Sequence, residues 1–200
     1  STNNSNNSIK KLEKNIENKL KISSLYNKEK LLFPVFLDNV IVLYKNGDKA
    51  IIKQENNRAI YIFKGAKDLK EGFSYNIQVN QIYDFYGLKE IKDFNILKEN
   101  SSFKNYKDLF LDGSKIDIFD FKYENEVITN LKGFITKGNL QINGGKTIKL
   151  FAKDKNILPK DGYTIEILNA QLGSYRGNMQ IIFHTKDDYK ELKWAKKVDC

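Results

Sequence analysis

The sequence predicts a mainly β protein that contains two copies of one small five-stranded barrel. Short runs rich in Val, Ile, Tyr and Phe alternate with polar residues and are separated by Asn-Gly, Gly-Asn and Gly-Gly turns, a pattern typical of short antiparallel strands. The order of these runs repeats once, with equivalent positions 88 to 90 residues apart. A chain of 200 residues is long enough to bury two small cores.

The N-terminal region differs from the rest of the chain. Residues 1–8 read STNNSNNS, a polar run with nothing to bury, and we expect a flexible tether there. Ile9, Leu12, Ile16 and Leu20 then recur at helical spacing, which predicts a helix over residues 9–22.

The two copies occupy most of the remaining chain, and we predict a first module over 23–100 and a second over 101–200. Arg58–Phe63 aligns with Lys146–Phe151, and the turn at Tyr86-Gly87 aligns with Arg176-Gly177. Each copy contains five predicted strands. They lie near 39–45, 49–54, 58–63, 73–82 and 88–96, and near 126–136, 139–143, 147–151, 163–172 and 178–185.

Short helices are expected between the strands. A helical lead-in precedes each copy, at 23–30 and at 103–110, and the segments 64–71 and 152–161 interrupt the copies after the third strand. Alternation points Ile60 and Ile62, like Ile148 and Leu150, toward one face, where they would fill the interior. Five short antiparallel strands interrupted after the third are the pattern of the OB-fold, a Greek-key barrel.

Four strings carry a resemblance to known modules. They are Val42-Leu43-Tyr44-Lys45-Asn46-Gly47, Ala59–Phe63, Leu69–Gly72 and Tyr86–Ile91. Together they resemble the OB-type modules of bacterial secreted and lipid-anchored proteins, over about residues 25–190. The matched positions are turn glycines and core residues, so the resemblance implies the fold and assigns no functional residue.

The chain carries a basic surplus that is almost entirely lysine. Lys and Arg number 34 against 25 Asp and Glu, which gives a net charge of +9, and only Arg58 and Arg176 are arginine. The lysines are spread along the whole length, which favours a solvated surface coat. A binding surface for a polyanion stays open as the alternative.

Aromatic residues supply the candidate ligand site, with 13 Phe and 11 Tyr in the chain. OB-folds bind ligands across strands two and three and on the loops that join strands one to two and four to five. Outward aromatic rings with flanking cations would suit unpaired bases or sugar rings. The alternative is that these rings pack against the neighbouring module. The candidate ligand-binding residues are Lys53, Arg58, Tyr61, Phe63, Tyr86, Lys149, Phe151, Tyr175 and Arg176.

Other motifs point to no catalytic, metal or cofactor site. Gly144-Gly145-Lys146-Thr147 lacks the first glycine of a phosphate-binding loop and precedes a strand, so we interpret it as a hairpin turn. The acidic stretch from Asp112 to Glu126 lacks EF-hand spacing, and we interpret it as a solvated linker rather than a cation site. His184 and Cys200 are the only residues of their types, which excludes a Cys/His zinc site and an internal disulfide.

Three functional hypotheses follow. The first is a non-catalytic adaptor that binds a protein or glycan partner. A Ser/Asn tract without an initiator Met resembles the linker behind a lipidated cysteine, so the adaptor would be exported to the periplasm or cell surface, with a lipid anchor upstream of Ser1. The alternative is a single-stranded nucleic-acid binder, which would be cytoplasmic. A hydrolase ranks third and would need Asp112, Asp117 and Asp120 clustered in a cleft.

Overall fold

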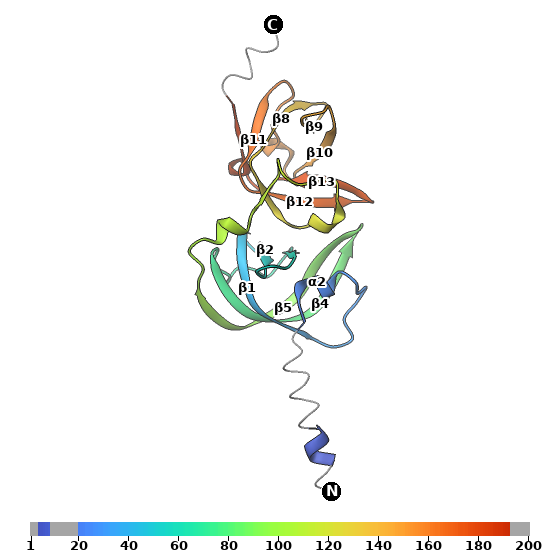
Figure 1. Cartoon of the computed structure of the whole chain (residues 1–200), viewed down its shortest axis with the longest axis vertical. Coiled ribbons are helices and arrows are strands. Elements are labelled where there is room, and N and C mark those ends of the chain that lie inside the picture. Colours follow the sequence, from blue (N-terminus) through green and yellow to red (C-terminus); the bar gives the residue numbers. More distant parts are fainter. Residues whose placement is uncertain (1–3, 9–19, 193–200) are drawn as a thin grey trace.

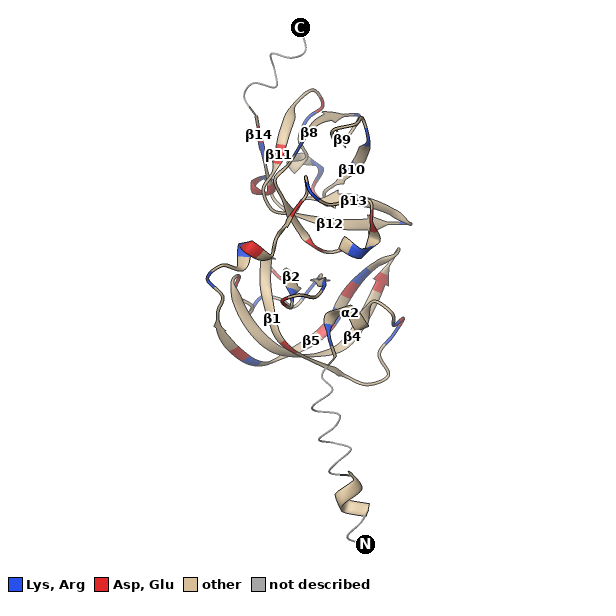
Figure 2. Ribbon diagram, viewed as in Figure 1, with Lys and Arg blue, Asp and Glu red and all other residues tan. Residues whose placement is uncertain are grey.

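The computed structural model describes residues 4–8 and 20–192. They are mainly β, as the alternation predicts, and the strands form two units stacked along the long axis of the molecule (Figure 1). In the view of Figure 2, positions of basic and of acidic residues both occur along the ribbons of the two units.

The first unit is a closed barrel with the strand order β1-β2-β3-β5-β4. The β3 and β5 strands run parallel, whereas the other neighbours are antiparallel, and β4 pairs back onto β1. This is the five-stranded Greek-key barrel of the OB type. Ile60 and Ile62 lie in its core, as alternation predicts. The strands are β1 (Val35–Asn46), β2 (Lys49–Lys53), β3 (Ala59–Ile62), β4 (Phe73–Phe85) and β5 (Leu88–Ser102).

The second unit repeats this order as β8-β9-β10-β13-β12 within a nine-stranded sheet, so the two OB modules lie in tandem. Ile148 and Leu150 lie in its core, as predicted. The strands are β6 (Leu111–Asp112), β7 (Val127–Thr129), β8 (Leu131–Thr136), β9 (Asn139–Gln141), β10 (Thr147–Phe151), β11 (Thr164–Ile167), β12 (Ala170–Tyr175), β13 (Asn178–Ile182) and β14 (Tyr189–Glu191).

The prediction of a second closed barrel needs correction, because the single strands expected over 126–136 and 163–172 are both split, the first into β7 and β8 at Asn130. The first half of the 163–172 strand, β11, pairs with β8, and its second half, β12, pairs with β13. This second break falls at Leu168 and Asn169, whose backbone N–H groups both donate to the carbonyl oxygen of Asp188, at 2.9 and 3.2 Å. These bonds replace the ladder at that point.

The helices of the described residues are all short. Residues 4–8, within the predicted tether, are helical, and positions 9–19 of the predicted N-terminal helix lie outside the described residues. The 103–110 lead-in contains one short helix, and no helix forms over 64–71. None of the described helices is long and apolar enough to cross a membrane. They are α2 (Ile22–Leu25), η1 (Tyr106–Leu109), η2 (Phe121–Tyr123), η3 (Lys155–Ile157) and η4 (Lys186–Asp188).

An apolar layer joins the two units. The outer face of β1, β2 and β3 is covered by Val127 and Ile182 of the second unit and by the connector around η1. The buried residues of this layer are Ile41, Leu43, Tyr44, Ile51, Ala59, Tyr61, Leu88, Val127 and Ile182. The two modules therefore share a hydrophobic interface rather than being joined only by a linker.

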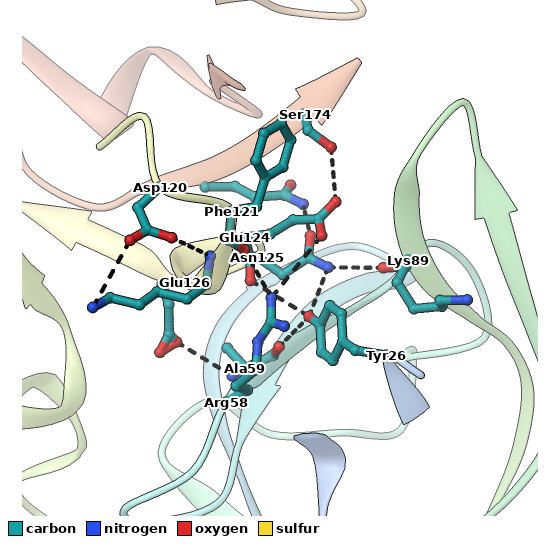
Figure 3. Close-up of polar contacts among 12 residues, drawn as sticks. Tyr26, Arg58, Ala59, Lys89, Asp120, Phe121, Glu124, Asn125, Glu126 and Ser174 are labelled. Atoms are coloured by element: carbon teal, nitrogen blue, oxygen red, sulfur yellow. Dashed lines mark hydrogen bonds and ion pairs between the residues drawn. The ribbon is translucent and has the colours of Figure 1, made fainter. Parts of the chain in front are cut away.

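The segment Glu124-Asn125-Glu126, which we call the acidic linker, supplies the polar part of this interface (Figure 3). Its residues are 6%, 0% and 3% exposed. Glu126 accepts from Lys53 Nζ at 2.5 Å and from the Ala59 N–H at 3.2 Å. The acidic stretch was expected to be a solvated linker, but at its end the side chains are buried and paired across the interface.

The other two residues of the acidic linker bond to both units. Asn125 Nδ2 donates to the Lys89 carbonyl oxygen at 2.7 Å and to the Tyr26 hydroxyl at 3.1 Å, while its Oδ1 accepts from Gln171. Its φ of 70° lies in the left-handed region, which Asn tolerates better than most residues. Glu124 accepts from Ser174 Oγ at 2.7 Å. Each linker residue thus stabilises a defined orientation of the units.

Glu126→Ala should lower the free energy of unfolding by about 3 kcal/mol, because the Lys53 ammonium stays buried without its partner. Urea denaturation of the variant and the parent measures the difference. The matched control is Glu166→Ala, which removes a surface carboxylate that pairs with Lys132 and Lys190 at 3.6 and 3.5 Å and should cost less than about 1 kcal/mol. Equal losses in the two variants would show that the acidic linker does not hold the units together.

Candidate functional site

Two hairpin turns, one from each unit, meet on the same side of the molecule (Figure 1). The turn between β4 and β5 carries Tyr86 and Gly87, and the turn between β12 and β13 carries Arg176 and Gly177. The backbone N–H of Arg176 donates to the carbonyl oxygen of Tyr86 at 2.8 Å. A Cβ added at Gly87 would lie 4.0 Å from the Gly177 nitrogen, so the turns are in direct contact.

Aromatic side chains gather at these turns in a group that we call the tip cluster, defined as Tyr83, Phe85, Tyr86, Tyr175 and Arg176. The ring of Tyr86 lies 4.9 Å from that of Phe85, edge to face, and 5.3 Å from that of Tyr175. Tyr83, Phe85 and Tyr86 are 44%, 42% and 52% exposed. Rings that contact one another while keeping about half of their surface in water form a platform open to a ligand.

Cations flank the rings of the tip cluster. The Arg176 guanidinium lies 5.1 Å from the ring centroid of Tyr86 and 5.3 Å from that of Tyr175. Lys92 Nζ lies 5.6 Å from the ring of Tyr83. These distances are within cation–π range, and a planar guanidinium can also stack on a base or bind a phosphate through two donors.

Both turns hold a bulky residue in a backbone conformation that disfavours it. Tyr86 has a φ of 52° and Arg176 a φ of 50°, and a glycine with positive φ follows each of them. Two successive positive φ angles define the type I′ hairpin turn, whose first position normally holds Asn, Asp or Gly. Tyr and Arg each cost about 1 kcal/mol or more there.

Lys137 allows this strain to be tested separately. It has a φ of 52°, precedes Gly138 and is exposed in the β8–β9 turn, outside the tip cluster. Lys137→Asn should raise the free energy of unfolding by about 1 kcal/mol, because only backbone strain is relieved. Arg176→Asn should leave it within about 0.5 kcal/mol of the parent, because the lost cation–π contacts offset the relief.

Thermal and urea unfolding of both variants test this assignment. A loss of more than about 2 kcal/mol in Arg176→Asn would mean that Arg176 is a structural residue rather than one exposed for a ligand.

Two of the candidate cations, Lys53 and Arg58, pair with carboxylates at the interface between the units and do not lie at the tip cluster. Lys53 is 7% exposed and pairs with Glu126. The Arg58 guanidinium lies 3.4 Å from the ring centroid of Tyr26, donates to the Phe121 carbonyl oxygen at 3.1 Å and lies 4.0 Å from Glu124 (Figure 3). Their charges are neutralised by carboxylates about 70 residues away in the chain.

The two candidate rings of the first barrel are also covered. Tyr61 is 7% exposed and lies in the apolar layer, 5.7 Å from the His184 ring, and Phe63 is partly buried against the same layer. Alternation correctly places Tyr61 outside the barrel core, but the second unit lies on that face. Packing against the neighbouring module, the alternative considered for these rings, is therefore the role that the structure gives them.

The remaining candidates are accessible and lie in two places. Tyr86, Tyr175 and Arg176 belong to the tip cluster, whereas Lys149 and Phe151 are exposed on β10. The sequence reasoning missed Tyr83 and Phe85. The sequence contains a signal for Phe85, because Phe85-Tyr86-Gly87 puts two aromatic residues directly at a hairpin turn on an OB ligand loop.

Glu90 lies on β5 and is only 6% exposed. Burial, and after it the charge of Asp84, raise the pKa of this carboxyl from 4.5 to about 7. Because the folded state favours the protonated form, the contribution of Glu90 to stability is complete below pH 4.5 and is lost as the pH rises through 7.

Glu90→Gln keeps the side chain neutral and should avoid this loss. Its free energy of unfolding should exceed that of the parent by about 1 to 2 kcal/mol at pH 8, and the difference should shrink toward pH 5. Urea denaturation between pH 5 and 8.5 measures both proteins, with Glu166→Gln as the control. A difference that does not change with pH would refute the raised pKa.

The other motifs keep structural roles. Asp112 accepts from Ser114, Asp117 from the Phe119 N–H and Asp120 from the Lys122 N–H, so each carboxylate caps its own turn. Within residues 4–8 and 20–192, no three His, Cys, Asp or Glu side chains are grouped to hold a metal ion. The sequence Gly144-Gly145 forms the turn between β9 and β10, as expected.

Several solved structures are similar to this chain, whereas the sequence matches no family model and no curated protein. A murine DNA-binding protein bound with double-stranded DNA shares 11% identity at a TM-score of 0.42, over 81% of this chain and 96% of that one. The p204 HINb domain shares 12% sequence identity at a TM-score of 0.41, over 82% of this chain and 100% of that one. Fission yeast Pot1, solved with single-stranded DNA, shares 10% sequence identity at a TM-score of 0.33, over 86% of this chain and 88% of that one.

These comparisons correct two expectations. The tandem OB modules are like those of HIN domains and Pot1, not specifically like those of bacterial secreted or lipid-anchored proteins. The similar chains whose ligand is named were solved with DNA and none with a protein or glycan partner, so the first hypothesis, an adaptor for such a partner, has no support among them and is not retained. Export and a lipid anchor stay predictions. At these identities and TM-scores the likeness carries no argument about function, so we argue function from the side chains.

Proposed function

We propose that this chain binds single-stranded nucleic acid and that unpaired bases stack on the tip cluster. The observation that carries the proposal is the meeting of one OB loop from each unit in a single exposed aromatic group with a guanidinium over two of its rings. Stacking on aromatic rings next to a cation is the way in which OB-folds bind single strands without reading their sequence.

The tip cluster favours unpaired over paired bases. In a duplex the base faces are stacked on one another, so an exposed ring meets only the backbone or the groove edges. An unpaired base can leave its neighbours and place its face on Tyr86 or Tyr175.

The binding site differs from the one expected from the sequence. The face of strands two and three of the first barrel, with Tyr61 and Phe63, is closed by the second unit. The loop that joins strands four and five is one part of the OB ligand surface that stays open in the first barrel, and Tyr86 lies on it. The proposed site therefore uses Tyr86, Tyr175 and Arg176 and adds Tyr83 and Phe85.

Fluorescence anisotropy with a labelled fifteen-residue oligothymidylate at low salt tests the proposal. Tyr86→Asn and Arg176→Asn keep the type I′ turn and should each weaken binding about tenfold, since base–aromatic stacking contributes about 1 to 3 kcal/mol per base. Lys137→Asn makes the same kind of turn substitution and removes one charge outside the cluster, so it should bind like the parent.

Two results would overturn the proposal. One is the absence of any binding of the oligothymidylate by the parent protein at low salt. The other is equal weakening in all three variants, which would indicate a general charge effect. Competition with a duplex of the same length should be weaker than competition with the unlabelled single strand.

A further inference from the structure

A concave site lies between the two units, and none of its lining residues belongs to the tip cluster. It is a groove of about 460 Å³ lined by the β1–β2 turn of the first unit and, from the second unit, by the loop after β10 and the end of β13. This volume is within the range of ligand sites. The lining residues used below are Asn46, Lys49, Lys153, Asp154, Phe183 and His184.

The groove has one lysine on each side. Lys49 comes from the first unit, and its ion pair in the described structure is with the adjacent Asp48, at 3.4 Å and with both side chains partly exposed. Lys153 comes from the second unit, is exposed and takes part in no ion pair within residues 20–192. Two such lysines facing one cavity are positioned to neutralise an anion held between them.

The acidic group in the lining is engaged elsewhere. Asp154 Oδ1 accepts from the Asn156 N–H at 3.0 Å, which caps η3. At the turn, a Cβ added at Gly47 would meet no atom within 4 Å, so the backbone there is open to a ligand. Asp154 keeps its charge, and the two lysines outnumber this one carboxylate among the lining residues; the entrance beside Lys49 is not obstructed.

A chain of hydrogen bonds holds His184 in place at the groove. Gln171 Nε2 donates to Asn125 Oδ1 at 2.9 Å, which leaves Gln171 Oε1 to accept from His184 Nε2 at 2.8 Å. Burial lowers the pKa of His184 to about 4, so the ring is neutral at pH 7, carries its proton on Nε2 and has an unprotonated Nδ1. The positive charge in the groove thus comes from the two lysines alone.

The backbone of the groove is continuous with β10. Phe151, at the end of β10, is 42% exposed, and its carbonyl oxygen accepts from the N–H of the groove residue Phe183 at 2.9 Å.

We propose that this groove binds a phosphate group of a polyanion between Lys49 and Lys153. In the context of the proposed function, on which this inference rests, that group is a backbone phosphate of the bound single strand. The tip cluster would then bind bases of the strand, and the groove would bind one phosphate of its backbone.

The salt dependence of binding tests the groove apart from the tip cluster. Each phosphate neutralised on a single strand contributes about 0.7 to the slope of log K against log salt concentration. Lys49→Gln with Lys153→Gln should reduce the magnitude of that slope by about 0.7 for the oligothymidylate, because the groove holds one phosphate. Tyr86→Asn should weaken binding without changing the slope. The matched control is Lys132→Gln with Lys190→Gln, which removes the same charge from two lysines paired with Glu166 and should leave the slope unchanged.

A second arm uses inorganic tripolyphosphate and follows the backbone amide signals of Gly47 and His184 by NMR. If the parent binds the oligothymidylate and the Lys49/Lys153 variant keeps its slope, the groove inference is overturned and the proposed function stands. If the parent binds no oligonucleotide, the proposed function fails. Saturable tripolyphosphate shifts that disappear in the variant would then support a site for free polyphosphate, and their absence would overturn the groove as well.

Discussion

The burial of the acidic linker between the two units is the constraint on which the rest of the structure depends. Glu126 pairs with Lys53, Glu124 bonds to Ser174 and lies beside Arg58, and Asn125 bonds to the backbone and side chains of both units. Buried charges are costly unless they are paired and hydrogen-bonded, so these partners are compatible with few relative orientations. The linker therefore determines how one OB module sits on the other.

This orientation decides which surfaces remain for a ligand. It closes the face of strands two and three on the first barrel, because Val127 and Ile182 pack onto the side that carries Tyr61. It also brings the Tyr86 turn against the Arg176 turn, where the two backbones share a hydrogen bond. The groove between Lys49 and Lys153 results from the same arrangement. Both proposed sites contain residues from both units, and neither unit would form them alone.

Most of the fold could be predicted from the sequence, because local signals determine it. Alternation identified the core positions Ile60, Ile62, Ile148 and Leu150, and the paired Tyr86-Gly87 and Arg176-Gly177 turns marked the hairpins. The split of the fourth strand of the second unit was missed. It depends on Asp188, whose carbonyl accepts from residues about 20 positions away, and no local pattern records that contact.

The candidate site was predictable only in part, for a related reason. Loop position and residue type were enough to propose Tyr86, Tyr175 and Arg176. Lys53, Arg58 and Tyr61 have the same kind of sequence signal, but Lys53 and Tyr61 are covered and Arg58 is paired, because the decisive contacts come from Glu124, Glu126 and the apolar layer. A single sequence shows that a residue points outward from its own barrel. It does not show whether a second barrel lies on that face.

Photo-crosslinking tests the central claim most directly, namely that unpaired bases stack on rings where the two modules meet. A fifteen-residue oligothymidylate carrying 5-iodouracil is irradiated with the parent protein, and the modified peptides are mapped by mass spectrometry. We expect crosslinks at Tyr83, Phe85, Tyr86 or Tyr175, reduced in Tyr86→Asn and unchanged in Lys137→Asn. Crosslinks confined to residues outside the tip cluster, or equally strong in Tyr86→Asn, would contradict the claim.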